Sequence, residues 1–157
     1  MRYGFVLLMC LITPLTHAED DPKATFGFDP QPMFGAWIST ESLHVAVPKD
    51  GGSIHAFSAR TGRWTHLTLK TKLPDDAYPI VNGEMAVIQT KDTIYAIGSQ
   101  MKEWKTLKLE TPGRQALVSG WSVRVEDGRH LFLIGADSEH WEGVDLDTGS
   151  VILPPSD

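Results

Sequence analysis

Cysteine is almost absent from this chain of 157 residues, whose one cysteine is Cys10. Cys10 lies in an apolar stretch near the start, so the rest of the chain has no thiol that could form a disulfide, attack a substrate or bind a metal. We therefore expect a fold held together by packing, with no site built on cysteine.

Positive charge is also scarce, because 14 Lys and Arg residues stand against 20 Asp and Glu residues, a net charge of -6. Proteins that bind nucleic acid rely on clustered positive charge. We therefore expect no nucleic-acid partner.

The longest apolar run, residues 5–12, is shorter than the roughly 20 residues that a membrane-spanning helix needs. No membrane span is therefore expected. Motifs that mark catalysis are missing too: the sequence has no Gly-x-Ser-x-Gly, no phosphate-binding glycine loop and no His-Glu-x-x-His. We therefore name no catalytic residue.

Residues 1–18 have the pattern of a secretory signal peptide, with Arg2 before the apolar run and a small residue, Ala18, at the end. Cleavage after Ala18 would leave 139 residues (157 minus 18) that begin at Glu19. The alternative is a lipoprotein anchored at Cys10, which requires a small residue where Met9 stands. We expect a secreted or periplasmic protein.

The chain contains three copies of one pattern, an apolar strand, a polar turn and then Trp-x-x-Leu/Val-x-Leu, over residues 54–69, 94–109 and 131–146. Their tryptophans, Trp64, Trp104 and Trp141, are separated by 40 and 37 residues. Periods near 40 residues built from β-hairpins are typical of propeller blades. We predict an all-β fold of three propeller-blade-like, four-stranded repeats.

The predicted organisation is a signal peptide over 1–18, an extended lead-in over 19–33 and a β-propeller-like repeat domain over 34–157. Its repeats are expected at about 34–73, 74–112 and 113–153. In each repeat, the two strands before the copied pattern are predicted at 37–39 and 43–47, at 80–83 and 85–89, and at 117–120 and 121–125.

Closed propellers have about four to eight blades, more than the three copies found here. The third strands, 94–97 and 131–134, are apolar on both faces, which requires cover on both sides. Two chains that close head to tail into a six-bladed homodimer would supply it. Alternatively, the lead-in with Phe26, Phe28 and Phe34 could fold back over an open face.

The segment Ala56-Phe57-Ser58-Ala59-Arg60-Thr61-Gly62-Arg63-Trp64 resembles the kelch and quinoprotein-type propeller repeats, and 144–149 is similar to their outer-strand turn. The resemblance implies the fold and no functional residue. Quinoprotein repeats place the Trp farther beyond Thr-Gly, so no pyrroloquinoline quinone site and no cofactor is expected.

Three histidines of the first repeat suggest a metal site at first, because they fall in successive strands. The turns predict that His44 and His66 flank Phe57 about 9.6 Å apart, two strand spacings, with His55 on the opposite face. Zinc needs its nitrogen ligands about 2.0–2.1 Å from the metal. We therefore expect no metal site. A calcium site at 145–149 is not expected either, because the later acidic ligand is missing.

The repeated Trp64, Trp104 and Trp141 are expected to be packing residues, since they share one position of the repeat. Trp37 and Trp121 have no such counterpart and are the candidate ligand-binding residues. The function predicted from the sequence is a secreted, non-catalytic module that binds a protein or a surface polysaccharide. The alternative is a small enzyme or lectin that acts on a carbohydrate in the central channel.

Overall fold

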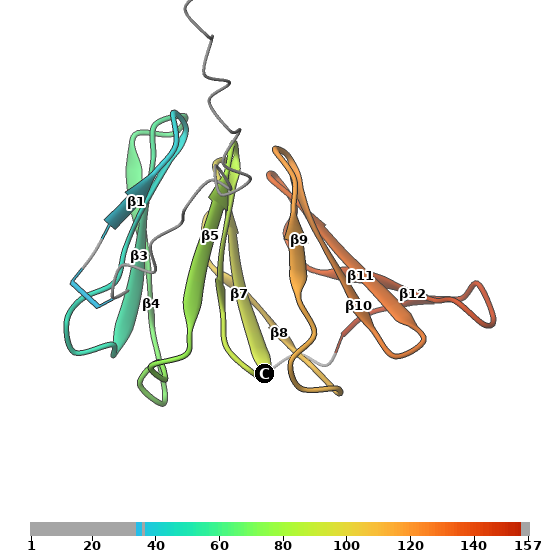
Figure 1. Cartoon of the computed structure of the whole chain (residues 1–157). Coiled ribbons are helices and arrows are strands. Elements are labelled where there is room, and N and C mark those ends of the chain that lie inside the picture. The colour runs from blue at the N-terminus through green and yellow to red at the C-terminus, as the bar shows by residue number, and fades with distance from the viewer. Residues whose placement is uncertain (1–33, 36, 155–157) are drawn as a thin grey trace, which may run out of the picture.

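The computed structural model describes residues 34, 35 and 37–154. They form three antiparallel sheets of short strands and no helix (Figure 1). The predicted signal peptide and lead-in, residues 1–33, lie outside the described residues. Phe34, which follows them, packs against the core. Within this part of the chain there is no helix that could cross a membrane.

The first sheet contains β1 (Trp37–Ser39), β2 (Leu43–Ala46), β3 (Ser53–Ser58) and β4 (Arg63–Thr68). The second sheet contains β5 (Tyr78–Asn82), β6 (Met85–Gln89), β7 (Thr93–Gly98) and β8 (Lys105–Lys108). The third sheet contains β9 (Ala116–Val118), β10 (Ser122–Asp127), β11 (His130–Gly135), β12 (Glu142–Asp145) and β13 (Val151–Ile152).

In every sheet, strands that follow each other in the chain lie side by side, which is the strand order of a propeller blade. The predicted fold class, all-β with three blade-like repeats, is therefore confirmed. The third sheet differs by its fifth strand, β13. The buried carboxylate of Asp145 accepts the backbone N–H groups of Asp147 (2.9 Å) and Thr148 (3.1 Å). The tight turn at 145–149 then brings the chain back beside β12, so this segment is a hairpin, as expected.

The three copies of the sequence pattern pair their strands in the same register. Ile54 lies opposite Leu67, and the corresponding pairs are Ile94 with Leu107 and Leu131 with Val144. Register decides which side of a sheet each side chain reaches, because successive residues of a strand point to opposite sides. Equivalent residues of the three sheets therefore point the same way.

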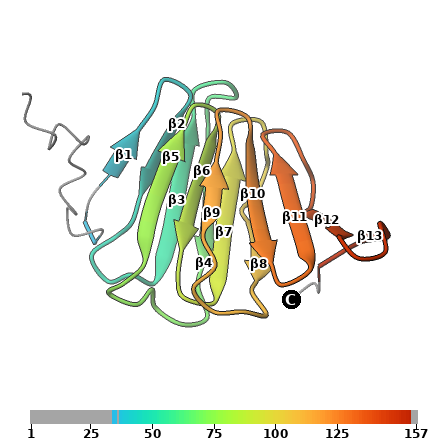
Figure 2. The ribbon, with the colours of Figure 1, turned by 45° about the vertical axis from the view of Figure 1, so that its right-hand side comes forward.

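We call the side of each sheet that carries Ile54, Ile94 or Leu131 its forward side, and the opposite side its rear side. The sheets stand next to one another in chain order (Figures 1 and 2). The forward side of the first sheet faces the rear side of the second, since Ser58 donates a hydrogen bond to the carbonyl of Ser99. The forward side of the second faces the rear side of the third, where Gln89 accepts the N–H of Ala116 at 2.9 Å.

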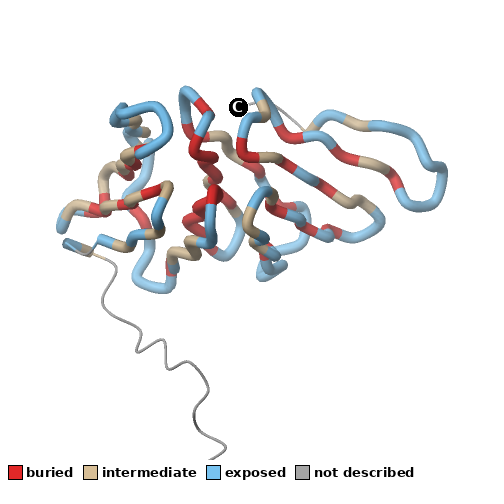
Figure 3. Tube along the Cα trace, turned by 90° about the horizontal axis from the view of Figure 1, so that it is seen from above, coloured by how far each residue is buried: buried red, intermediate tan, exposed pale blue. Residues whose placement is uncertain are grey.

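The second sheet is covered on both sides, as expected of its apolar third strand, where Ala96 and Ile97 point to opposite sides and are both buried (Figure 3). In the third sheet the expectation holds for one side only. Phe132 and Ile134 are buried against the second sheet, whereas Leu133, on the forward side, is 41% exposed. Residues 37–154 form no fourth sheet that could cover it.

The shared role predicted for the repeated tryptophans is wrong for one of them. Trp104 and Trp141 are buried, but Trp64 is 63% exposed. Trp64 pairs with Phe57 on the rear side of the first sheet. The equivalent rear sides of the second and third sheets are covered by the sheet that precedes them, whereas no described sheet precedes the first one.

Glycine permits a close approach of backbone between the second and third sheets. A Cβ atom on Gly98 would lie closer than 3.0 Å to backbone atoms of Ala136. The carbonyl of Ala136 accepts the N–H of Gln100 at 3.1 Å. The two sheets can therefore approach this closely only because residue 98 has no side chain.

Candidate functional site

The two tryptophans predicted as ligand-binding residues lie in different sheets. Trp37, in β1, is 73% exposed and points to the rear side of the first sheet, with Ala46 opposite it. Trp121, in the turn between β9 and β10, is 60% exposed. The guanidinium carbon of Arg60 lies 5.9 Å from the centroid of its ring, within the range of a cation–π contact. Trp121 thus contacts the first sheet, and the two residues form two separate surfaces.

Glu84 is the centre of a polar network between the first two sheets. It is buried in the turn between β5 and β6. Its carboxylate accepts hydrogen bonds from Arg60 (Nη2, 2.6 Å), from the hydroxyl of Ser42 (2.7 Å) and from the hydroxyl of Ser99. Because Arg60 also contacts Trp121, one chain of contacts joins all three sheets.

This network lowers the pKa of Glu84 from 4.5 to about 2. The largest cause is the hydrogen bond from Arg60, followed by the one from Ser99. The same contact raises the pKa of Arg60. Glu84 is therefore a fixed carboxylate at neutral pH, and its low pKa makes it a poor general base. Its chemistry is that of a structural ion pair.

Sequence reasoning missed this network. The partners of Glu84 are separated from it by 42 residues (Ser42), 24 residues (Arg60) and 15 residues (Ser99). No local pattern links residues at these separations. The one signal was the acidic residue itself in a short turn between two apolar strands.

The rear side of the first sheet is an open surface of aromatic and histidine side chains. We call it the aromatic–histidine face, and its residues are Trp37, His44, His55, Phe57, Trp64 and His66. Phe57 lies at its centre, with ring centroids 5.4 Å from Trp64 and 5.9 Å from His44. The strand residues on this side carry no Asp, Glu, Lys or Arg.

The histidine arrangement differs from the predicted one. His44 lies opposite Phe57, as expected, but His66 lies opposite His55, with the two rings stacked 5.9 Å apart. The hairpin closes with the pair Ser58 and Arg63, so the strands are shifted relative to the turn assumed from the sequence. His55 and Phe57 are two residues apart in β3 and so point to the same side, which makes the expected position of His55 on the opposite face wrong. All three histidines share one side. Among the described residues, no group of three or more His, Cys, Asp or Glu side chains could hold a metal ion.

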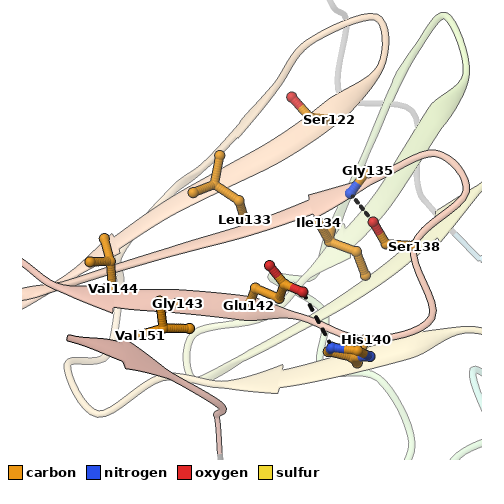
Figure 4. A pocket seen from close by; sticks show the side chains of 10 residues that line it. All are labelled: Ser122, Leu133, Ile134, Gly135, Ser138, His140, Glu142, Gly143, Val144 and Val151. Carbon is orange, nitrogen blue, oxygen red and sulfur yellow. Dashed lines mark hydrogen bonds and ion pairs between the residues drawn. The ribbon is translucent and has the colours of Figure 1, made fainter. Parts of the chain in front are cut away.

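The forward side of the third sheet is the second open surface. We call it the leucine face, and its apolar residues are Leu117, Leu131, Leu133, Val144 and Val151. A shallow pocket of about 410 Å³ lies on it, beside Leu133, Val144 and Val151 (Figure 4). This surface also carries the exposed charged side chains of Arg124, Glu126 and Glu142.

Two pairs of polar groups in this pocket contact each other. The hydroxyl of Ser138 accepts the N–H of Gly135 at 2.9 Å, and His140 lies 3.5 Å from Glu142 (Figure 4). No hydrogen bond joins Ser138 to His140 among the described contacts of the pocket. Ser138 and His140 are thus not paired as nucleophile and base in the described contacts.

The innermost strands β1, β5 and β9 lie next to one another, with β5 in contact with both neighbours. They are the strands that line the channel in a propeller. The Asn82 side-chain amide donates a hydrogen bond to the carbonyl of Val118 at 3.1 Å. This polar group therefore joins β5 to β9.

No family model and no curated protein matches the sequence. Solved structures resemble it in fold. Hsv2 of Kluyveromyces lactis has 14% identity and a TM-score of 0.40, with 68% of this chain and 38% of that chain covered. BamB of Moraxella catarrhalis has 13% identity and a TM-score of 0.33, with 71% and 49% covered. The N-terminal domain of Nup159 has 17% identity and a TM-score of 0.33, with 78% and 34% covered.

These neighbours are WD40 or β-propeller-type proteins, and a kelch repeat in particular stays a prediction for this chain. Their TM-scores are all below 0.5, so we infer nothing about this chain from them. This chain spans less than half the length of each of the three. At such identities the likeness concerns the fold alone. The blade-like arrangement rests on the strand order and register of the chain itself.

Proposed function

We propose that this protein is a non-catalytic interaction module that binds another protein through the aromatic–histidine face. The observation that carries the proposal is the exposure of Trp37 and Trp64, at 73% and 63%, on one side of one sheet. Apolar patches of this kind on a soluble protein mark interaction sites. Interface centres are rich in aromatic residues and poor in charged ones, as this side of the sheet is.

The relative orientation of the rings favours a protein over a polysaccharide. Trp64 is tilted by 52° and His44 by 40° against the central ring of Phe57. A sugar chain stacks on flat, open aromatic faces, whereas these rings form an uneven surface. Side chains of a partner protein can fill such a surface, and buried aromatic residues dominate the energy of protein interfaces.

We also propose that the interaction takes place outside the cytoplasm. The support is the signal-peptide pattern of residues 1–18, with its positive residue, its short apolar run and Ala18 at the predicted cleavage site.

The test compares the same substitution, Trp to Ser, at two exposed positions. Immobilised wild-type protein, Trp64→Ser and Trp121→Ser are exposed to the extracellular or periplasmic fraction, and captured proteins are identified by mass spectrometry. We expect a partner that wild type and Trp121→Ser retain and Trp64→Ser loses. With the purified partner, calorimetry should then give at least a tenfold weaker affinity for Trp64→Ser.

A glycan array with the same three proteins separates the alternatives. We expect no glycan binding. Glycan binding that Trp64→Ser loses would make this face a carbohydrate site, and a partner lost only by Trp121→Ser would move the binding site to the turn beside Arg60.

A further inference from the structure

We propose that the partner of the aromatic–histidine face is a second copy of this chain, whose leucine face docks on it, so that two chains close head to tail into a ring of six sheets. This inference rests on the proposed function, because it names the protein that the face binds. It is carried by the way the sheets already pack within one chain.

The chain makes the same kind of interface twice. At the first interface, buried residues of the forward side of the first sheet and the rear side of the second meet: Leu43, Val45, Ile54, Ala86, Ile88 and Ile97. At the second interface, the equivalent sides of the next two sheets meet through Met85, Val87, Ile94, Val123, Phe132 and Ile134. Both interfaces pair a forward side with a rear side.

The two open surfaces are the missing halves of a third such interface. The leucine face is the forward side of the last sheet, and the aromatic–histidine face is the rear side of the first. These two sheets stand at the two ends of the row of three sheets (Figure 1). Leu133 occupies the repeat position of Ala56 and Ala96, and Phe57 occupies that of Ile97 and Ile134. In contact with a second copy, each open side therefore meets a side with the same repeat register as its counterpart at the two interfaces within one chain.

The charged groups of the leucine face and the hydrogen-bonding groups of the aromatic–histidine face are complementary. The leucine face carries two carboxylates, Glu126 and Glu142, and one guanidinium, Arg124. The aromatic–histidine face carries no charged residue, so the contact brings no like charges together. Its imidazole N–H groups can donate to carboxylates, and its indole rings can accept a guanidinium over their faces.

Closure favours a second copy over an unrelated partner. A head-to-tail contact that repeats after a half turn closes with twofold symmetry and covers both open surfaces of both chains. An unrelated protein that binds the aromatic–histidine face leaves the leucine face in water. Six sheets also fall within the range of about four to eight blades of closed propellers, and the three described sheets by themselves do not.

The experiment measures the mass of the purified protein in solution by light scattering between about 1 and 100 µM. Twice the mass of one chain is expected. Leu133→Asp, on the leucine face, and His55→Asp, on the aromatic–histidine face, should each weaken the dimer at least tenfold. The control Thr71→Asp, an exposed change in the segment between β4 and β5, should remain a dimer.

Mixing the two face variants tests the head-to-tail arrangement. A mixed pair has one intact interface, made by the leucine face of the His55→Asp chain and the aromatic–histidine face of the Leu133→Asp chain. Equimolar mixing should therefore give a larger fraction of dimer than either variant forms alone at the same total concentration. Circular dichroism and a thermal melt verify that both variants are folded.

A wild-type monomer at 100 µM would overturn the ring without any reference to the variants. Dimers lost in only one face variant, with no recovery on mixing, would indicate a face-to-face contact and would also overturn it. In either case the proposed function is judged separately, by whether a different protein is captured in a Trp64-dependent way.

Discussion

Trp64 and Trp104 occupy the same position of the repeat, yet Trp64 is 63% exposed and Trp104 is only 5% exposed. The difference follows from the stack: the rear side of the second sheet is covered by the first sheet, and the rear side of the first sheet by nothing in the described chain. One sequence position thus stabilises the fold in one copy and forms a surface in another.

Trp104→Ala should lower the free energy of unfolding by about 3–5 kcal/mol, the usual cost of removing a large buried aromatic residue. Trp64→Ala should lower it by less than about 1 kcal/mol, because exposed positions contribute little. Thermal and urea denaturation measure both. Equal losses in the two variants would contradict the different burial of the two residues.

Acid should weaken the contact between the first two sheets. The folded protein holds the pKa of Glu84 at about 2, below its ordinary value of 4.5. A group with a lowered pKa contributes stability that is fully present above its unfolded pKa and is lost as pH falls toward its folded pKa. We therefore expect Glu84 to contribute above about pH 5 and to lose its contribution between about pH 5 and pH 2.

Denaturation of wild type and Glu84→Gln over this pH range tests the assignment. The stability difference between them should be largest near pH 7 and should shrink as the pH falls. Glu103→Gln is a suitable control. Lys105 lowers the pKa of Glu103 too, but Glu103 lies in an exposed loop, where solvent screens the ion pair, so its stability difference should be smaller than that of Glu84→Gln. A stability difference that stays constant from pH 7 to pH 2 would show that Glu84 is not an acid-sensitive group.

Gly98→Ala should destabilise the protein by about 1–3 kcal/mol, the cost of overpacking a filled space. The added Cβ would lie closer than 3.0 Å to backbone atoms of Ala136. Backbone atoms cannot move aside as the end of a flexible side chain can. Gly120→Ala is the matched control, since no atom lies within 4 Å of its added Cβ and its φ is not positive. Thermal melts of both variants should differ clearly.

Mass spectrometry of the exported protein should find a chain that begins at Glu19 and carries no lipid. The expectation follows from the apolar run before Ala18 and from Met9, which does not suit a lipidation signal before Cys10. An acylated chain that begins at Cys10 would instead identify a lipoprotein.

The sequence by itself determined the strands and much of their pairing. Strand pairing within a hairpin is local, so a repeated pattern of apolar residues and turns carries enough information to predict it. That the strand of Ile54 pairs with the strand of Leu67, and the strand of Ile94 with that of Leu107, follows from that pattern. Where the turn was assigned wrongly, at 60–63, the register and the position of His66 were wrong as well.

Only the tertiary structure decided what each copy of the pattern does. Burial depends on which sheet stands next to a residue, and that neighbour is not encoded at the residue's own position. For this reason Trp64 is exposed although Trp104 and Trp141 are buried. The contact of Glu84 with Arg60 likewise exists because two turns of different sheets meet at the same end of the stack, 24 residues apart in the chain.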